Sequence, residues 1–522
     1  MARDFLCTPE YPIASTAEGK LKGFALDGVL TFYGIPYATA QRFHPAQPVA
    51  PWEGVREATN YGAVCPIFES GPPANDLMTP HRYWPQDEAC QNLNIWTKTL
   101  DSHAKHPVLV WLHGGGFSDG SALEQVAYEG DQLCQKGDVV VVSVNHRLNI
   151  LGYLDLSDFG EPYKNSANAG ITDLVEALRW VRRNIAAFGG DPDNVTLFGQ
   201  SGGGGKVYTL LQTPEAAGLF HKAVIMSGTD NFDRSQPHAP FVREMLRLLE
   251  IPEGEVSLLE KVPYPLLVKA YQAAARKVGA TLNWGPLPNG YYLGHPVEVG
   301  FSPFAKTVPL IVGTVVAEFG GVQKFAVSPT ATEEEKREAI RQTYTGHDQE
   351  IIPLFQQAYP HTDLSAVPKW DTWVRPGALA FLDRWVEDQS AAPAYLYQFA
   401  LVFDINGGIP AWHCADIPFV FHNTCRVPCA NIPQVTGRLE AQMAGALLAF
   451  ARTGNPNHPG LPLWEPYTKE GKETMVFDRE CALRKNLDTH LLQALQAYLP
   501  PRQPFAMPLP PEDPDDLLPW RI

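Results

Sequence analysis

Short apolar runs alternate with segments of helical periodicity through most of this chain. The runs are the length of buried strands and lie at 106–112, 139–144, 195–198, 222–226, 308–314 and 394–400. Between them, residues 169–188 place Leu174, Leu178, Val181 and Ile185 on one helical face, and residues 438–453 repeat the helical signal. This alternation predicts a mostly parallel central sheet flanked by helices.

The N-terminal region, one internal stretch and the C-terminal tail depart from this pattern. Near the N-terminus, Asp27-Gly28 lies between alternating apolar residues, which is a hairpin signal. The polar stretch 332–344, TEEEKREAIRQTY, predicts a solvated helix, and residues 500–522 predict a frayed or surface-wrapping tail rich in proline and acidic residues. Because the chain of 522 residues contains no internal linker or repeat, we expect one large domain over 1–522 with insertions.

Composition and charge disfavour several classes of function. A net charge of −16 argues against a nucleic-acid partner, which requires a basic face. We expect no membrane span, and the first fifteen residues lack the apolar core of a secretory signal. This favours a cytoplasmic location and leaves open a mature secreted form. Cys425 and Cys429, with His413 and His422 nearby, match no zinc-ligand spacing, so no metal is expected.

The sharpest chemical signal is LFGQSGGGGKV, residues 197–207, which follows a predicted strand and precedes a predicted helix. A phosphate-binding loop, G-x-x-x-x-G-K-[ST], fails here because Gln200 and Val207 occupy its first and last positions. The motif G-x-S-x-G is met around Ser201. It places a serine on a sharp strand-to-helix turn at the top of a sheet. Ser201 is therefore predicted to be a nucleophile, against the alternative of a glycine-rich surface loop.

A serine nucleophile needs a base, an acid that orients the base, and N–H donors for the oxyanion. The segment HGGGF, residues 113–117, follows a buried strand, where open α/β sheets bind ligands. Its glycines leave room for backbone N–H groups to face a cleft. The segment is the candidate source of the oxyanion donors.

Several stretches together resemble the type-B carboxylesterase and cholinesterase family of α/β-hydrolases. FGGDPDNVTLFGQSGG, residues 188–203, resembles the family's serine signature at every defined position, and EACQNLNIW, residues 88–96, resembles its second signature with departures at Ala89 and Gln91. FYGIPYA, RFHPAQP, HGGGF, VNHRLNILGYL, ARTGNPN and TMVFD resemble further landmarks in the family's order. The resemblance implies the α/β-hydrolase fold, with N-terminal hairpin strands, helical insertions, and the chain order serine, acid, histidine.

The resemblance also implies roles for individual residues. It assigns the base to His413 in AWHCADIPFVF and the acid to Glu318 in PLIVGTVVAEFGG, where Ala317 and Phe319 replace the family's usual Asp and Gly. The implied oxyanion donors are the N–H groups of Gly115, Gly116 and Gly202, the last of which is commonly alanine in the family.

Further features are implied by the same resemblance. Arg147 with Asp173, and Arg42 with Glu88, resemble buried ion pairs of the family. Cys65 and Cys90 stand where family members form a small-loop disulfide; we expect a bridge in an oxidising compartment and thiols in the cytoplasm. Cys414 stands where the family has Gly or Ser, which predicts a small buried filler or an oxidisable thiol.

The predicted function is that of a serine carboxylic ester hydrolase that acts through an acyl-enzyme on small to medium esters without a cofactor. The same residues serve amide, lactone or carbamate hydrolysis, and a non-catalytic binding protein is disfavoured because the triad is complete. Gln200, where cholinesterases have Glu, argues against a cholinesterase. We expect substrate contacts from Phe117, Gln200 and Trp284, with Trp284 limiting the acyl chain; the oligomeric state is left open.

Overall fold

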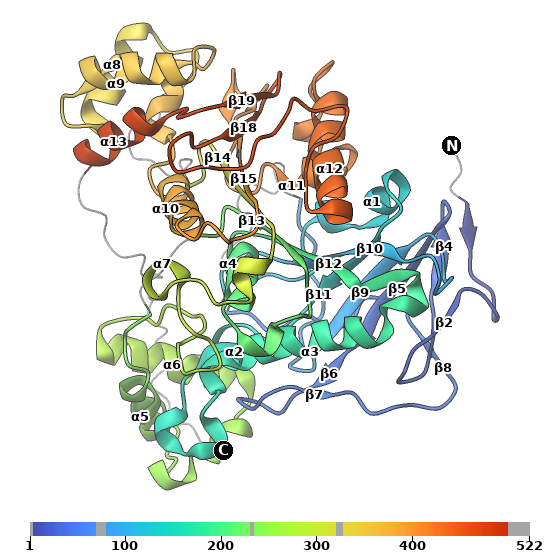
Figure 1. Ribbon diagram of the computed structural model, residues 1–522. Coiled ribbons are helices and arrows are strands. Elements are labelled where there is room, and N and C mark those ends of the chain that lie inside the picture. The colour runs from blue at the N-terminus through green and yellow to red at the C-terminus, as the bar shows by residue number, and fades with distance from the viewer. Residues whose placement is uncertain (1–3, 69–79, 230–233, 320–326, 500–522) are drawn as a thin grey trace.

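A twelve-stranded sheet forms the centre of the protein in the computed structural model, which describes residues 4–68, 80–229, 234–319 and 327–499 (Figure 1). Its strand order is β1-β4-β5-β9-β11-β10-β12-β13-β14-β15-β18-β19. Neighbours from β11 through β18 pair in parallel. The strands nearer each edge pair antiparallel. The predicted mostly parallel sheet with N-terminal hairpin strands is confirmed, whereas the predicted tail at 500–522 lies outside the described residues.

The parallel strands are the apolar runs of the sequence. They are β10 (His106–Leu112), β11 (Val140–Val144), β12 (Gly190–Gln200), β13 (Lys222–Met226), β14 (Leu310–Val315), β15 (Ala394–Phe399) and β18 (Thr474–Phe477). They are apolar on both faces because helices cover both faces. Val108 and Val110 of β10 join the core cluster that contains α3 (Ala169–Asn184), whereas Leu109 and Trp111 join the cluster that contains α12 (Thr436–Thr453).

The N-terminal strands form the antiparallel edge of the sheet. In the hairpin of β4 (Phe24–Leu26) and β5 (Val29–Pro36), Leu26 pairs with Val29, so that Asp27 and Gly28 are the whole turn. Both turn residues have positive φ, 51° and 79°, as the predicted two-residue hairpin requires. The remaining strands are β1 (Phe5–Leu6), β2 (Ile13–Ser15), β3 (Lys20–Lys22), β6 (Ala38–Thr39), β7 (Gln47–Pro48), β8 (Val55–Glu57), β9 (Asn92–Thr97), β16 (Val402–Phe403), β17 (Ile409–Pro410) and β19 (Ala482–Arg484).

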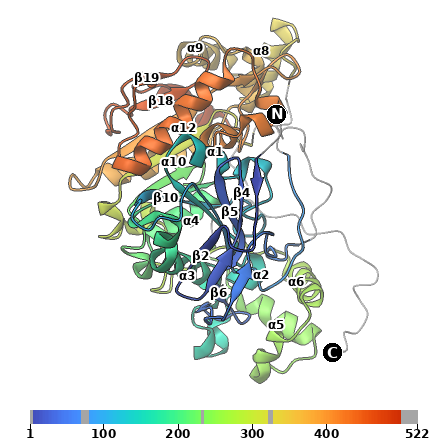
Figure 2. The same ribbon diagram turned by 90° about the vertical axis from the view of Figure 1, so that its right-hand side faces the viewer.

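Two groups of helices extend beyond the sheet and form the predicted insertions (Figures 1 and 2). One contains α5 (Ala239–Leu248) and α6 (Tyr264–Val278), the other α8 (Glu333–Thr343), α9 (Asp348–Ala358) and α13 (Thr489–Tyr498). The predicted solvated helix is α8, and Thr332 and Glu335 cap its start reciprocally. The other α-helices are α1 (Asp131–Lys136), α2 (Asn149–Tyr153), α4 (Gly202–Leu211), α7 (Pro296–Val299), α10 (Val374–Val386) and α11 (Ile417–Val420).

Both predicted ion pairs are confirmed. The buried Arg147 guanidinium lies 2.6 Å from the Asp173 carboxylate, which also accepts from the Arg147 backbone N–H. These extra hydrogen bonds offset part of the cost of removing two charges from water. Arg42 pairs with Glu88 and donates to two backbone carbonyls of the loop before α6.

Cys65 and Cys90 are both buried, and both are free thiols in this structure. A hydrogen bond with Cys65, followed by burial, raises the pKa of the Cys90 thiol well above its usual value. The two residues therefore lie side by side, as the resemblance implies, and whether they are bridged depends on the redox state of the compartment.

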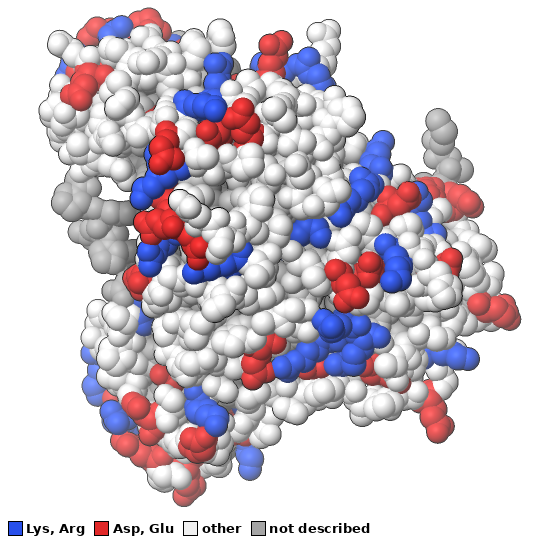
Figure 3. All heavy atoms as spheres, viewed as in Figure 1, with Lys and Arg blue, Asp and Glu red and all other residues white. Residues whose placement is uncertain are grey.

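On the face shown in Figure 3, acidic and basic side chains are interspersed, with wide uncharged stretches between them. The net negative charge is thus not gathered into one patch on this face. Of the helices in the described ranges, none is both long and apolar enough to cross a membrane. The same ranges contain no group of three or more His, Cys, Asp or Glu side chains placed to hold a metal ion.

Candidate active site

Ser201 lies on the sharp turn between β12 and α4. Its φ of 57° and ψ of −127° fall in a region that side-chain-bearing residues rarely adopt. Two hydrogen bonds hold the turn: the Ser201 N–H donates to the Met226 carbonyl at 2.8 Å, and the Ser201 carbonyl accepts from the Gly205 N–H at 3.0 Å. This is the strained strand-to-helix turn that the G-x-S-x-G motif predicts.

The glycines around Ser201 allow unusually close backbone packing. A Cβ at Gly203 would lie 2.0 Å from the Leu112 carbonyl oxygen, and one at Gly202 would lie 2.1 Å from the Gly116 carbonyl oxygen. Any larger residue would therefore push α4 away from the end of β10 and from the loop after it. At Gly205, in contrast, an added Cβ would make ordinary contact, 3.4 Å from the Phe117 ring.

The loop after β10 presents its backbone beside Ser201. Gly115 and Gly116 have φ of 81° and 62°, which favour glycine. A Cβ on the preceding Gly114 would lie 3.4 Å from the Ser201 Cβ, so this loop passes directly against the serine. The three predicted oxyanion donors, Gly115, Gly116 and Gly202, thus come from the loop after β10 and from the start of α4, which lie against each other.

His413 and Glu318 meet at the carboxyl ends of the central strands. The ring nitrogen His413 Nδ1 lies 2.5 Å from Glu318 Oε2. The backbone N–H of His413 donates to the backbone carbonyl of Glu318 at 2.8 Å. The other carboxylate oxygen, Glu318 Oε1, accepts from Ser227 Oγ at 2.7 Å and from the Val315 N–H at 2.9 Å. Ser227 was not predicted as a site residue, and its position as a polar residue directly after β13 is the signal that the sequence offers.

The Gln200 amide lies over the His413 ring. The Gln200 Nε2 atom is 3.3 Å from His413 Nε2 and 3.5 Å from His413 Nδ1. An atom in the plane of the ring at these two distances would overlap the ring carbon between the nitrogens, so the amide lies above the ring plane. The in-plane lone pair of His413 Nε2 is therefore left for another donor. Within the described chain Ser201 Oγ forms no hydrogen bond to this ring; such catalytic bonds often tighten only with substrate present.

An aromatic side chain covers the imidazole where the family usually has glycine. The Phe319 ring lies 4.2 Å from the His413 ring, centre to centre, and 5.5 Å from the Trp373 ring. Phe319 remains 45% exposed, so its ring borders both His413 and solvent. The entrance to the site therefore has an apolar aromatic wall beside His413.

Two further buried carboxyl groups lie near Glu318. Burial, and next the negative charge of Glu318, raises the pKa of Asp371 to about 7. Burial raises the pKa of Asp416 to about 6, and Asp416 accepts a 2.6 Å hydrogen bond from the Tyr397 hydroxyl. Among the described residues it is Glu318, and neither of these two, that forms the ion pair with the His413 imidazole.

The predicted substrate contacts occupy different positions. Phe117 and Trp284 are both 4% exposed, and Arg234 connects them: its guanidinium lies 5.0 Å above the Phe117 ring and its Nε donates to the Trp284 carbonyl at 3.3 Å. The Trp284 ring packs against Tyr271. Gln200 instead contacts His413, so its predicted role in binding substrate stays a prediction.

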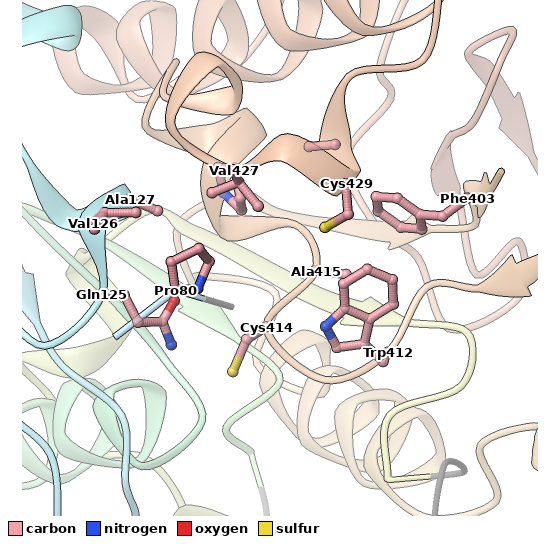
Figure 4. A pocket seen from close by; sticks show the side chains of 12 residues that line it. Pro80, Gln125, Val126, Ala127, Phe403, Trp412, Cys414, Ala415, Val427 and Cys429 are labelled. Carbon is pink, nitrogen blue, oxygen red and sulfur yellow. The ribbon is translucent and has the colours of Figure 1, made fainter. Parts of the chain in front are cut away.

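Cys414 directly follows His413 and has a positive φ of 76°. Its thiol donates to Gln200 Oε1 at 3.1 Å, a pairing that the sequence does not indicate. Figure 4 shows Cys414 at the edge of a small pocket that Gln125, Trp412 and Cys429 also line. Burial raises the pKa of the Cys414 thiol well above its usual value, which disfavours the reactive thiolate and fits the filler interpretation.

The chain is similar in sequence and in structure to known esterases. The model of the carboxylesterase family matches residues 10–495. The chain is 33% identical to para-nitrobenzyl esterase of Bacillus subtilis, covering 93% of this chain and 98% of that protein. A solved esterase from Clostridium hathewayi, described as able to hydrolyse aliphatic aromatic polyesters, is 47% identical with a TM-score of 0.91, covering 95% of this chain and 100% of that one.

Proposed function

Because the chain belongs to the carboxylesterase family, and so is a carboxylic ester hydrolase of the α/β-hydrolase fold, we propose that it acts through Ser201, His413 and Glu318. The observation that carries this proposal is the 2.5 Å contact between Glu318 and His413, whose ring also lies against Gln200, the residue before the strained turn at Ser201. Glu318 and His413 are 95 positions apart in the chain, and their contact supports the acid and base roles of a serine hydrolase.

In the proposed reaction, His413 Nε2 takes the Ser201 proton while Oγ attacks the carbonyl carbon of the ester. The N–H groups of Gly115, Gly116 and Gly202 donate to the oxyanion of the tetrahedral intermediate. His413 then gives its proton to the leaving alcohol, and an acyl-enzyme remains. Water, activated by the same imidazole, releases the acid, and Glu318 stabilises the imidazolium in both steps.

The close approach of Gly202 to Gly116 yields a testable prediction. Gly202→Ala places a methyl group where the Gly116 carbonyl now lies, so the loop must shift by more than an ångström. Misplacing an oxyanion donor typically costs about 10²–10³-fold in kcat. We expect a loss of this size in steady-state hydrolysis of p-nitrophenyl acetate.

Gly205→Ala is the matched control, since it adds the same methyl group to the same helix with ordinary contacts. We expect unchanged activity and a stability gain of up to about 1 kcal/mol from helix propensity. Full activity in Gly202→Ala would show that the loop does not need its present position.

We further propose that the site admits crowded alcohol groups and is more selective for the acyl group. Three consecutive glycines, Gly114 to Gly116, leave no side chain beside the oxyanion donors. On the acyl side, the shared contacts of Arg234 support a pocket bounded by Phe117 and Trp284. The exposed Phe319 ring beside His413 supports aromatic substrates, as does the described activity of the Clostridium hathewayi esterase.

A panel of esters tests this preference. We expect measurable hydrolysis of tert-butyl acetate and linalyl acetate, and a rate that falls between p-nitrophenyl butyrate and octanoate because each methylene changes binding by about 1–3 kcal/mol. Trp284→Ala is expected to favour longer chains. No turnover of either tertiary ester would contradict the alcohol-side proposal, and a flat chain-length profile would contradict the acyl-side one.

A further inference from the structure

Lys206 is a buried lysine that the proposed mechanism does not use. It lies on α4 five residues after Ser201, and its side chain has no solvent exposure. Its Nζ lies 2.8 Å from the His113 carbonyl oxygen, 3.5 Å from the Gly114 carbonyl oxygen and 5.8 Å from the centre of the Phe117 ring. Burying an ammonium group is costly, so its contacts with this loop need an explanation.

The carbonyl groups of the loop are held by partners within the protein. The Gly114 carbonyl accepts from His113 Nδ1 at 2.9 Å as well as from Lys206. The Gly115 carbonyl accepts from the N–H groups of Ser118 and Asp119, at 3.2 and 2.9 Å. In a planar trans peptide, the C=O of one residue and the N–H of the next point in opposite directions. Fixing the Gly114 carbonyl therefore also aims the Gly115 N–H.

Two half-buried acids, Glu124 and Asp119, lie near the Lys206 side chain. Burial lowers the pKa of Lys206 to about 7, against the opposing effects of Glu124 and Asp119. Burial raises the pKa of Glu124 to about 7 and that of Asp119 to about 6. Burial and then Lys206 lower the pKa of His113, which keeps that ring neutral with a single N–H to donate. Glu124 and Asp119 therefore favour the charged form of Lys206 and oppose the effect of burial.

We propose that Lys206 is a positioning residue of the oxyanion hole. It binds the carbonyls of His113 and Gly114 on the interior side of the loop, and so directs the Gly115 N–H toward the tetrahedral intermediate. The proposal rests on the proposed nucleophile, Ser201, and goes beyond it by adding a residue that contacts neither substrate nor triad.

The test compares transition-state binding with ground-state binding in Lys206→Met. We expect kcat/KM for p-nitrophenyl acetate to fall about tenfold to a hundredfold, less than for loss of a direct donor. The affinity for an aryl trifluoromethyl ketone, which forms a tetrahedral adduct, should fall by the same factor. KM and inhibition by the product acid should change less than about twofold, because ground-state binding does not use the oxyanion donors.

Two further variants complete the experiment. Lys206→Gln keeps an N–H donor and is expected to recover part of the loss; it also decides the question if Lys206→Met does not fold. Lys222→Met is the control, since Lys222, at the start of β13, is also buried but binds Asn194 of β12, away from this loop. It should leave both kcat/KM and ketone affinity unchanged.

The outcomes separate this proposal from the proposed function. Wild-type kcat/KM in Lys206→Met, or a loss that appears equally in KM and product-acid binding, overturns the positioning role. If ketone affinity depends on Ser201 but not on Lys206, only this inference fails. If Ser201→Ala leaves ketone affinity unchanged, the proposed nucleophile itself is wrong.

Discussion

Ser201→Ala is expected to lower kcat/KM for p-nitrophenyl esters about a millionfold while leaving the protein folded, because loss of a serine nucleophile removes the covalent route entirely. Stability should change little. The strained φ and ψ of this turn are set by backbone hydrogen bonds to Met226 and Gly205, which alanine keeps. Steady-state kinetics with p-nitrophenyl esters measure the loss of kcat/KM, and thermal unfolding of the same preparation measures the change in stability.

Labelling with a fluorophosphonate gives an independent reading of the same prediction. The wild-type protein should take up one equivalent at Ser201, identified by peptide mapping, and Ser201→Ala should take up none. Ser390→Ala, which removes an exposed serine that bonds only to its own loop, serves as the control and should behave as wild type. Retention of more than a few per cent of activity in Ser201→Ala would refute the assignment.

Glu318→Gln is expected to lower kcat about 10⁴-fold, a smaller loss than the roughly 10⁶-fold loss expected for His413→Ala. The reason lies in the hydrogen bonds of Glu318. Its Oε1 accepts from the Val315 N–H, which can only donate, so the glutamine oxygen must occupy that position. The amide NH₂ then faces His413 Nδ1 and forces the proton to Nε2. The imidazole then cannot accept the Ser201 proton.

A second glutamate–histidine pair provides the matched controls. Glu440 is buried and lies 3.2 Å from His422 Nδ1, outside the proposed site. Glu440→Gln and His422→Ala should alter stability at most. Wild-type rates in Glu318→Gln would instead direct attention to Asp371 or Asp416, the other carboxyl groups nearby.

Some residues of the proposed site carry a local signal in the sequence and others do not, for physical reasons. The turn at Ser201 is a local structure, and its glycines are visible in the sequence because contacts of 2.0–2.1 Å exclude any Cβ. His413 and Glu318 carry no local signal that separates them from other histidines and acids; only the resemblance pointed to them. Ser227 was missed because its role depends on contact with Glu318, 91 positions away.

The sequence by itself determined the elements of this protein and its chemical class. Runs of apolar residues specify buried parallel strands, Asp27-Gly28 specifies a hairpin, and G-x-S-x-G specifies the sharp strand-to-helix turn at Ser201, since each depends on interactions between near neighbours. Only the tertiary structure decided which polar groups meet. It set the Gln200 amide over the His413 ring and buried the Lys206 ammonium against the loop after β10. These contacts join residues about 90 to 210 positions apart, and their energies come from burial and from hydrogen bonds that no local pattern encodes.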